Sequence, residues 1–216
     1  MPEIEIIFQN AELIAVNKPA GLLTVPGRGG AVSEPCLTRI LREKTGENLL
    51  PVHRLDREVS GVVIFARNQA SHRRLNALFE GRDIFKTYLA LVCGRIEKDS
   101  GEIDKPVREY GSGRMGISAA GKSSLTRFKV LERLKNHTLL QVNPVTGRRH
   151  QIRVHLYSIG HPVAGDPLYG DRKLQNKYPR LMLHSAGLEL PVSGKKKIAI
   201  KAEPPEEFQA LLKSLC

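Results

Sequence analysis

Cysteine and long apolar runs are both scarce in this chain of 216 residues. Its cysteines, Cys36, Cys93 and Cys216, are widely spaced, odd in number and free of any CxxC pair, which argues against a disulfide framework or a zinc ribbon. No apolar run approaches the roughly 20 residues that a membrane span needs. The acidic start, Met-Pro-Glu-Ile-Glu, lacks the basic and then apolar pattern of a signal sequence. We therefore expect a protein of the reducing cytoplasm with no membrane partner.

Patterns that would hold a metal or a nucleotide are also missing. The histidines form neither HExxH nor a Cys/His set, so no metal is expected. Gly116–Ser123 matches the phosphate-loop pattern GxxxxGK[ST] letter for letter. However, a polar, Gly-rich stretch precedes it and a strand-like stretch from Leu125 follows it, whereas a phosphate loop joins a buried strand to a helix. No apolar strand ending in Asp is available to hold magnesium, and a phosphate-transfer enzyme is therefore the weaker alternative.

Positive charge is in excess and is unevenly distributed. The chain has 34 Lys and Arg against 22 Asp and Glu, a net charge of +12. Residues 1–100 carry 14 basic and 12 acidic side chains, whereas residues 101–216 carry 20 and 10. A basic face of this kind is typical of proteins that bind nucleic acid, because neutralising phosphates releases counterions. The alternative is a basic protein with no such partner.

The apolar pattern predicts an α+β fold in a single domain covering residues 1–216. Helices are predicted at 36–44, at 68–80 with Asn68 as the cap, at 146–159 with Thr146 as the cap, and from Pro205 onward. Residues 100–123 read as a long loop or loose hairpin. Strands are predicted at 4–8, 13–16, 62–66, 87–92, 125–131, 138–142, 181–190 and 198–201. Because strands and helices do not alternate regularly, a mixed, mainly antiparallel sheet with flanking helices is expected.

The most informative stretch is His53-Arg-Leu-Asp-Arg-Glu58, which places one carboxylate between two arginines and leads into an apolar strand. Nearby guanidinium groups keep a carboxylate ionised, so Asp56 could serve as a nucleophile. A structural ion pair explains the same pattern.

A second informative stretch runs from Thr146 to His155 and is strongly basic. It offers Arg153 as a two-pronged partner for a carboxylate, although an ordinary cationic helix face explains it equally well. Between the two stretches, Tyr88 lies in a predicted strand, where a tyrosine is usually part of the core.

Taken together, these stretches resemble the RluA family of pseudouridine synthases over nearly the whole chain. Val16–Pro26 is similar to the family's opening motif, and His53–Gly61 to its catalytic motif. Lys86-Thr-Tyr88 and Gly147–Arg153 follow in the family's order, as do His161-Pro, Gly165-Asp166 and Leu168-Tyr-Gly170. One departure is Val59, where the family usually has threonine; we expect it to affect local packing. The chain resembles the short members, which consist of the catalytic domain without an N-terminal RNA-binding module.

The resemblance implies the pseudouridine synthase fold with an active-site cleft, and an isomerase that requires no cofactor or metal. It makes Asp56 the nucleophile, attacking either the sugar or the uracil ring. It makes Arg153 the partner that keeps Asp56 ionised, and it places Tyr88 and Ile152 against the two sides of the uracil.

The expected partner is RNA, and the target uridine must be flipped out of its stack to be reached. Arg54 is the candidate to fill the vacated gap, while His53, Arg149 and Lys122 are expected to contact RNA. Large-subunit rRNA and a tRNA stem-loop are both open as targets, and a monomer is expected. The alternative is a non-catalytic RNA-binding module, against which the joint presence of Asp56, Tyr88 and Arg153 argues.

Overall fold

Each of the two structural units of this protein combines two separate segments of the sequence. The computed structural model describes residues 3–27, 34–111, 113–191 and 197–215. The first unit comprises Met1–Phe85 and Ser185–Pro204, and the second comprises Lys86–His184 and Pro205–Cys216. Cys36 and Cys93 are free thiols, and Cys216 lies outside the described residues.

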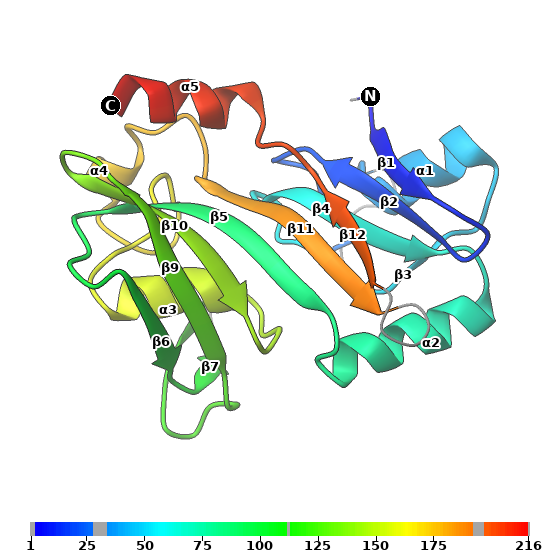
Figure 1. Ribbon diagram of the computed structural model, residues 1–216, viewed down its shortest axis with the longest axis horizontal. Coiled ribbons are helices and arrows are strands. Elements are labelled where there is room, and N and C mark those ends of the chain that lie inside the picture. Colours follow the sequence, from blue (N-terminus) through cyan, green and yellow to red (C-terminus); the bar gives the residue numbers. More distant parts are fainter. Residues whose placement is uncertain (1–2, 28–33, 112, 192–196, 216) are drawn as a thin grey trace. The chain divides into compact units, whose positions relative to one another are not determined.

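The first unit contains a sheet whose central strand is buried on both faces. All seven residues of β4 (Ser60–Ala66) are buried, as its continuous apolar sequence predicts. β4 pairs antiparallel with β2, which pairs antiparallel with β1. The strand order is β1-β2-β4-β11, with β3 beside β4 and β12 beside β11 (Figure 1). The other strands are β1 (Glu5–Gln9), β2 (Leu13–Lys18), β3 (Leu50–Pro51), β11 (Leu183–Pro191) and β12 (Lys197–Lys201).

Two helices of the first unit begin and end as the sequence predicts. In α2 (Gln69–Glu80), Asn68 Oδ1 accepts a hydrogen bond from Ser71 N at 2.9 Å, which satisfies a free amide of the first turn. α1 (Leu37–Thr45) ends at Gly46, whose positive φ of 71° suits glycine. The buried face of α2 joins β2 and β4 in one hydrophobic cluster that includes Leu75, Leu13, Val62 and Ile64.

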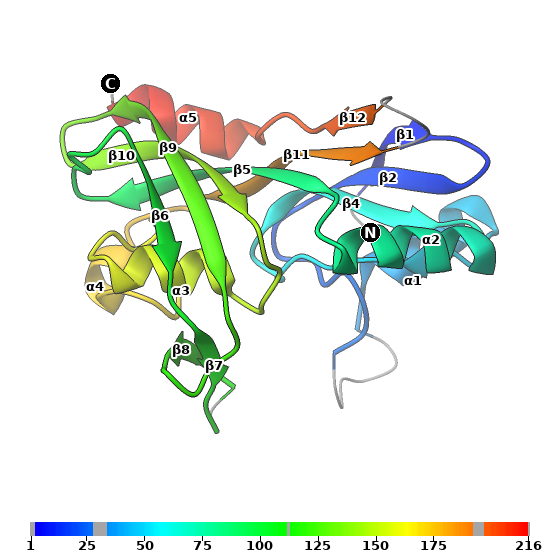
Figure 2. The same ribbon diagram turned by 60° about the horizontal axis from the view of Figure 1, so that its bottom comes forward.

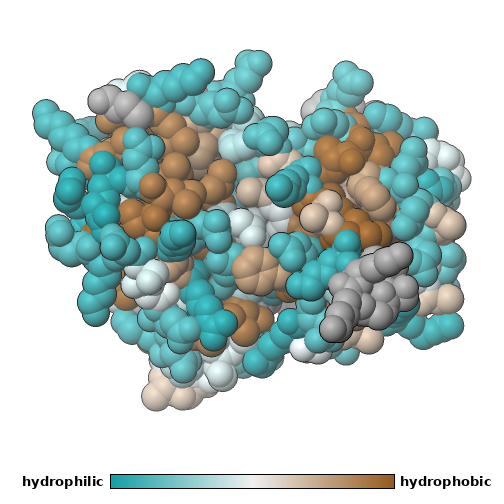
Figure 3. Space-filling view, in the orientation of Figure 1, coloured by the Kyte–Doolittle hydropathy of each residue, from teal (hydrophilic) through white to brown (hydrophobic). Residues whose placement is uncertain are grey.

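The second unit contains a mostly antiparallel sheet in the order β5-β10-β9-β6. Its strands are β5 (Phe85–Cys93), β6 (Ser100–Asp104), β9 (Leu125–Arg133) and β10 (His137–Pro144). α3 (Gln151–Ser158) packs against β9 and β10, and α5 (Glu206–Leu215) lies on the other side of these strands (Figure 2). The short helix α4 (Arg172–Gln175) was not predicted. Figure 3 shows hydrophobic side chains gathered over β9 and β10, within a largely polar surround.

The stretch 100–123 is more ordered than its polar, Gly-rich sequence predicts. It contains β6 and a separate hairpin of β7 (Val107–Glu109) and β8 (Met115–Ile117). The stretch Gly116–Ser123, which matches the phosphate-loop pattern, is followed by the strand β9 and not by a helix. This agrees with the expectation that it is not a phosphate loop. β6 is a strand because its backbone pairs with β9, a partner distant in the sequence that the local pattern of residues does not predict.

The predicted start of α3 at Thr146 is wrong by several residues. His150 adopts a left-handed backbone with φ of 53°, so the helix begins only at Gln151. Thr146 Oγ1 donates to Gln151 Oε1 at 2.6 Å and accepts from Leu125 N at 3.1 Å. The threonine therefore ties the approach to α3 onto β9 and does not cap the helix.

The fold class is confirmed as α+β with mainly antiparallel strands. Among the described residues, none of the helices combines the length and apolar character required to cross a bilayer.

Candidate active site

In the first unit, the loop that carries Asp56 is hydrogen-bonded on both sides of this residue. Leu55 N donates to Thr24 Oγ1 at 3.2 Å, and Thr24 Oγ1 donates back to Leu55 O at 3.1 Å. Val59 N donates to Asp56 O at 3.2 Å, which closes a turn directly before β4. Asp56 itself is half-buried. The loop thus presents this carboxylate from a backbone that neighbouring residues hold in one conformation.

A buried lysine holds the other end of the same loop. Lys18 is fully buried, and its Nζ donates to the carbonyl oxygens of Pro19, Leu22 and Arg57 at 2.9, 2.7 and 3.1 Å. An ammonium has three donors, and all three are used here, so its burial carries no unsatisfied hydrogen bond. Gly21 N also donates to Arg57 O at 2.8 Å. The opening motif, Val16–Pro26, therefore braces the motif that contains Asp56.

Arg57 and His53 have structural contacts within the first unit. The guanidinium of Arg57 donates to Gly21 O at 3.0 Å and pairs with Glu34 at 3.2 Å. His53 Nε2 accepts from Ile64 N at 3.0 Å, and its ring stacks on Phe79 with centroids 4.7 Å apart. The RNA contact expected of His53 stays a prediction.

Close approach of two strands explains the glycine that ends the catalytic motif. Gly61 has a positive φ of 113°, and a side chain there would collide with the backbone carbonyl of Ser185. Only glycine allows β4 and β11 to meet at this point. Arg54 is exposed, as expected of a residue that enters RNA, and its role stays a prediction.

In the second unit, Arg153 forms a buried two-pronged ion pair with Asp166. Arg153 Nε donates to Asp166 Oδ2 at 2.7 Å and Nη2 donates to Oδ1 at 2.8 Å. The two side chains are 1% and 0% exposed. Asp166 was noted in the sequence only as part of a motif, and its link to Arg153 was missed because the two residues are not at helical spacing. The predicted pairing of Arg153 with Asp56 stays a prediction, since these residues belong to different units.

Asp166 is itself held in place by backbone amides and by Gln175. Its Oδ1 accepts from Leu168 N at 2.9 Å and from Tyr169 N at 3.1 Å. Gln175 Oε1 accepts from Gly165 N at 2.6 Å and from Asp166 N at 3.2 Å. Gln175 therefore fixes the backbone at Gly165 and Asp166, and through it the position of the Asp166 carboxylate that pairs with Arg153.

Tyr169 lies beside this ion pair. The guanidinium carbons of Arg153 and Arg114 are each 5.3 Å from the centroid of its ring, a distance at which a cation interacts with an aromatic face. Its hydroxyl accepts from Met115 N at 3.1 Å and lies 2.9 Å from His150 Nδ1. Burial raises the pKa of Tyr169, so this tyrosine is neutral.

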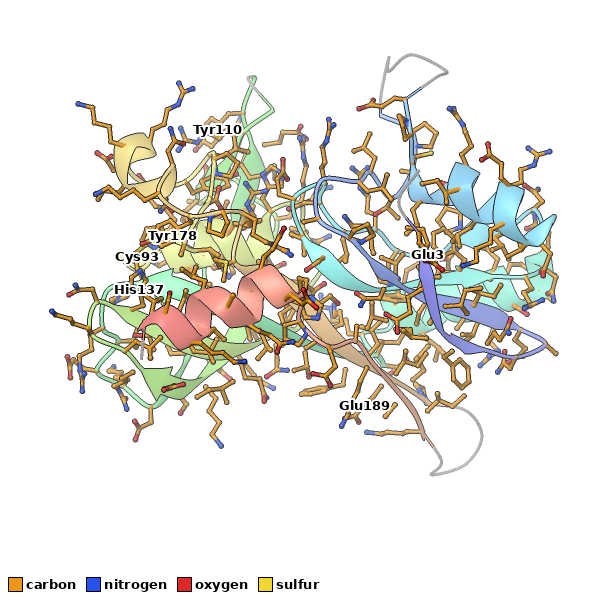
Figure 4. The ribbon with its side chains drawn as sticks, turned by 90° about the horizontal axis from the view of Figure 1, so that it is seen from above. Glu3, Cys93, Tyr110, His137, Tyr178 and Glu189 are labelled. Atoms are coloured by element: carbon orange, nitrogen blue, oxygen red, sulfur yellow. The ribbon has the colours of Figure 1, made fainter. Side chains whose placement is uncertain are left out.

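From Gln175, polar contacts continue to a small cluster of Cys93, Tyr178 and His137, which Figure 4 shows close together. Gln175 Nε2 lies 3.9 Å from Cys93 Sγ, which lies 3.6 Å from the Tyr178 hydroxyl. That hydroxyl lies 2.7 Å from His137 Nε2. Burial, followed by the contact with Cys93, raises the pKa of Tyr178, and burial lowers the pKa of His137. Both pKa shifts favour the uncharged forms of Tyr178 and His137.

The remaining predicted site residues of the second unit lie on β5, on α3 and near the β7–β8 hairpin. Tyr88 is half-buried and opposite Val142 of β10, and Ile152 precedes Arg153 on α3 with 7% exposure. Arg149 is exposed and pairs with Glu109 of β7 at 2.8 Å. Lys122 is exposed, and its backbone pairs with that of Val107. The structure thus brings Arg149 and Lys122 to the same hairpin.

Among residues 3–27, 34–111, 113–191 and 197–215, no group of three or more His, Cys, Asp or Glu side chains is arranged to hold a metal ion.

Comparison with known proteins agrees with this arrangement of motifs. Residues 12–158 match a family model described as RNA pseudouridylate synthase. The chain is 38% identical over 200 residues to the dual-specificity RNA pseudouridine synthase RluA of Haemophilus influenzae, covering 89% of this chain and 90% of that protein. It is 34% identical over 234 residues to the ribosomal large subunit pseudouridine synthase D of Pseudomonas aeruginosa, covering 99% and 72%.

A solved structure has the same fold over the full length. Human RNA pseudouridylate synthase domain containing 1 superposes with a TM-score of 0.80 at 26% identity, covering 99% of this chain and 94% of that one. The motif order, the fold and the sequence identity over most of the chain agree, and this protein therefore belongs to the RNA pseudouridylate synthase family of RNA-acting isomerases.

Proposed function

We propose that this protein converts specific uridines of structured RNA to pseudouridine, with Asp56 as the nucleophile. In this reaction the bond between uracil N1 and the sugar's anomeric carbon breaks, and a bond from uracil C5 to the same carbon forms. The proton on C5 is released and N1 gains a proton. Atoms and electrons balance without an oxidant or a water molecule consumed.

The observation that carries the proposal is the bracing of the Asp56 loop. Thr24 holds Leu55 on one side, and Lys18 and Gly21 hold Arg57 on the other. A nucleophile must be held close to its productive geometry to form a covalent intermediate. A carboxylate attacking the sugar or the uracil ring requires the same fixed placement, so the bracing is compatible with both routes.

The proposal assigns residues of both units to one reaction and treats residues 1–216 as one catalytic domain. Arg153 keeps Asp56 ionised, Tyr88 lies against the uracil and takes part in removing the C5 proton, and Ile152 packs on the ring's other side. The burial of Arg153 on α3 supports its role, because electrostatic contacts are stronger away from water. Ile152, the residue before it, supplies an apolar side chain of the kind that packs on a ring.

The proposed substrates are large-subunit rRNA and a tRNA stem-loop. The name of one relative refers to the ribosomal large subunit, which supports the rRNA target, and the name of another refers to dual specificity for RNA, which is compatible with a second substrate. Arg54 fills the gap left by the flipped uridine, and Arg149, Lys122 and His53 contact RNA. The protein is proposed to act as a monomer in the cytoplasm.

Tritium release from RNA labelled at uracil C5 tests the chemistry directly. Asp56→Asn is expected to abolish release, while RNA affinity stays near that of the unchanged protein. Asp83→Asn, which alters an exposed carboxylate of the same unit, serves as the matched control and should release tritium normally. Release by Asp56→Asn at the unchanged rate would refute the nucleophile.

Mapping pseudouridines in RNA from cells with and without the protein tests the substrates. Loss of signal in both rRNA and tRNA is expected, and loss in only one of them narrows the substrate class.

A further inference from the structure

The second unit contains a pocket whose lining includes neither Tyr88 nor Arg153. It lies between the β7–β8 hairpin and the second half of α3 and has a volume of about 470 Å³. The residues that matter for its chemistry are three tyrosines, one arginine and two aliphatic side chains: Tyr110, Tyr157, Tyr169, Arg114, Ile117 and Val154. Such a mixture of aromatic and aliphatic walls with one cation suits a flat, partly polar ligand.

Two of the tyrosines are exposed, and the third is fixed beneath them. Tyr110 is 47% exposed and Tyr157 is 45% exposed, whereas Tyr169 is 1% exposed. The rings of Tyr157 and Tyr169 are 6.1 Å apart. Figure 4 shows Tyr110 on the hairpin. Exposed aromatic rings around a recess are the usual platform on which nucleobases stack.

Positive charge borders the same pocket. Arg114 lies over the Tyr169 ring, and Arg149 reaches the hairpin to pair with Glu109. Together with Arg108 on β7, the hairpin and Arg149 supply three arginines against one glutamate. The local charge therefore favours a ligand that carries phosphates, and it disfavours a basic or purely apolar partner.

We propose that this pocket binds a nucleobase of the RNA substrate other than the uridine that is modified. The inference rests on the proposed function, because it takes the RNA as the source of the base. The base stacks on Tyr157 and Tyr110, and its flanking phosphates lie near Arg114 and Arg149. Tyr169, the floor of the pocket, also contacts Arg153, so a bound base adjoins the residue that the proposed chemistry uses.

The absence of tryptophan from the chain allows a direct test. Tyr157→Trp introduces a single tryptophan, whose fluorescence a stacked base quenches. The probes are a short single-stranded oligoadenylate and an abasic oligonucleotide of the same length, which has the phosphates but no bases. Quenching by the oligoadenylate alone is expected. Leu131→Trp, at a position on β9 that is also 45% exposed, should respond to neither probe.

Affinity measurements give a second, independent readout. Tyr157→Ala is expected to weaken RNA binding about tenfold, as loss of one stacked base does, while Tyr157→Phe keeps the ring and should bind normally. Equal quenching by both probes, or equal quenching at both reporter positions, would show that the pocket does not recognise a base. Quenching by neither probe would also overturn the proposal, and it is the result expected if the pocket binds a protein.

The outcomes also separate this inference from the proposed function. Tritium release with unchanged RNA affinity in Tyr157→Ala refutes the pocket and leaves the isomerase intact. Base-dependent quenching without any tritium release refutes the proposed reaction and leaves the pocket intact.

Discussion

Arg153 and Asp166 form two parallel hydrogen bonds in the interior of the second unit, with both side chains almost completely buried. A buried guanidinium without its counter-charge is costly, since removal of one partner of such a pair destabilises a protein by about 3–5 kcal/mol.

The first prediction concerns this ion pair. Asp166→Asn is expected to lower the free energy of unfolding by about 3 kcal/mol or more, because Arg153 keeps its charge in a dry site. Urea denaturation measures the loss. Asp171→Asn, a change at an exposed Asp that caps α4, is the control and should cost about 1 kcal/mol or less. Equal losses in the two variants would contradict the importance of the buried pair.

The second prediction concerns Gln175. Gln175→Leu leaves the amides of Gly165 and Asp166 without their acceptor, and we expect a loss of about 1–3 kcal/mol in unfolding free energy. Because these amides position the partner of Arg153, tritium release should also fall, through kcat more than through KM. Gln209→Leu, on the exposed side of α5, should leave kcat unchanged. A stability loss without any change in kcat would restrict Gln175 to a structural role.

The third prediction concerns Lys18. Lys18→Met removes the donor that three carbonyl oxygens share, so the loop bearing Asp56 loses a brace and kcat is expected to fall at least tenfold. Lys44→Met is the matched control, because Lys44 donates to a single carbonyl, that of Ile4, in the same unit. Steady-state tritium release compares the two, and an unchanged kcat in Lys18→Met would show that the brace does not serve catalysis.

The fourth prediction concerns pH and His155. This side chain is fully buried, with Nδ1 at 2.9 Å from Thr126 Oγ1 and Nε2 at 2.9 Å from Lys105 O. Burial lowers its pKa below the ordinary value of 6.5. Below pH 6.5 the unfolded chain therefore binds more protons at this histidine than the folded chain does. The contribution of His155 to the free energy of unfolding is fully present above about pH 6.5 and is lost as the pH falls below that value.

Urea denaturation across this pH range measures the effect. His155→Gln should flatten the decline below pH 6.5, with the slope due to buried His137 remaining. A decline as steep as that of the unchanged protein would assign the pH dependence to other groups.

Much of the fold followed from local patterns. The continuous apolar run at 62–66 predicted the buried strand β4, and Asn68 predicted the start of α2. The boundary of α3 could not be predicted, because it depends on the left-handed backbone of His150 and on contacts of Thr146 with β9. Strand β6 was missed for a similar reason, since its hydrogen bonds go to β9, more than twenty residues further along the chain. The β7–β8 pair falls within the loose hairpin that the sequence allowed.

For the site, the resemblance of several motifs, in order, to those of a known family was enough to predict the family and to select Asp56, Tyr88 and Arg153 as candidate site residues. The contacts that hold these residues could not be found in the same way. Lys18 meets Arg57 across 39 residues and Arg153 meets Asp166 across 13, separations that match neither helical nor strand periodicity. Long-range pairs of this kind form only when the folded backbone brings their segments together. The sequence by itself therefore determined the family and the candidate reacting groups, whereas the three-dimensional packing decided which partners hold these residues in place.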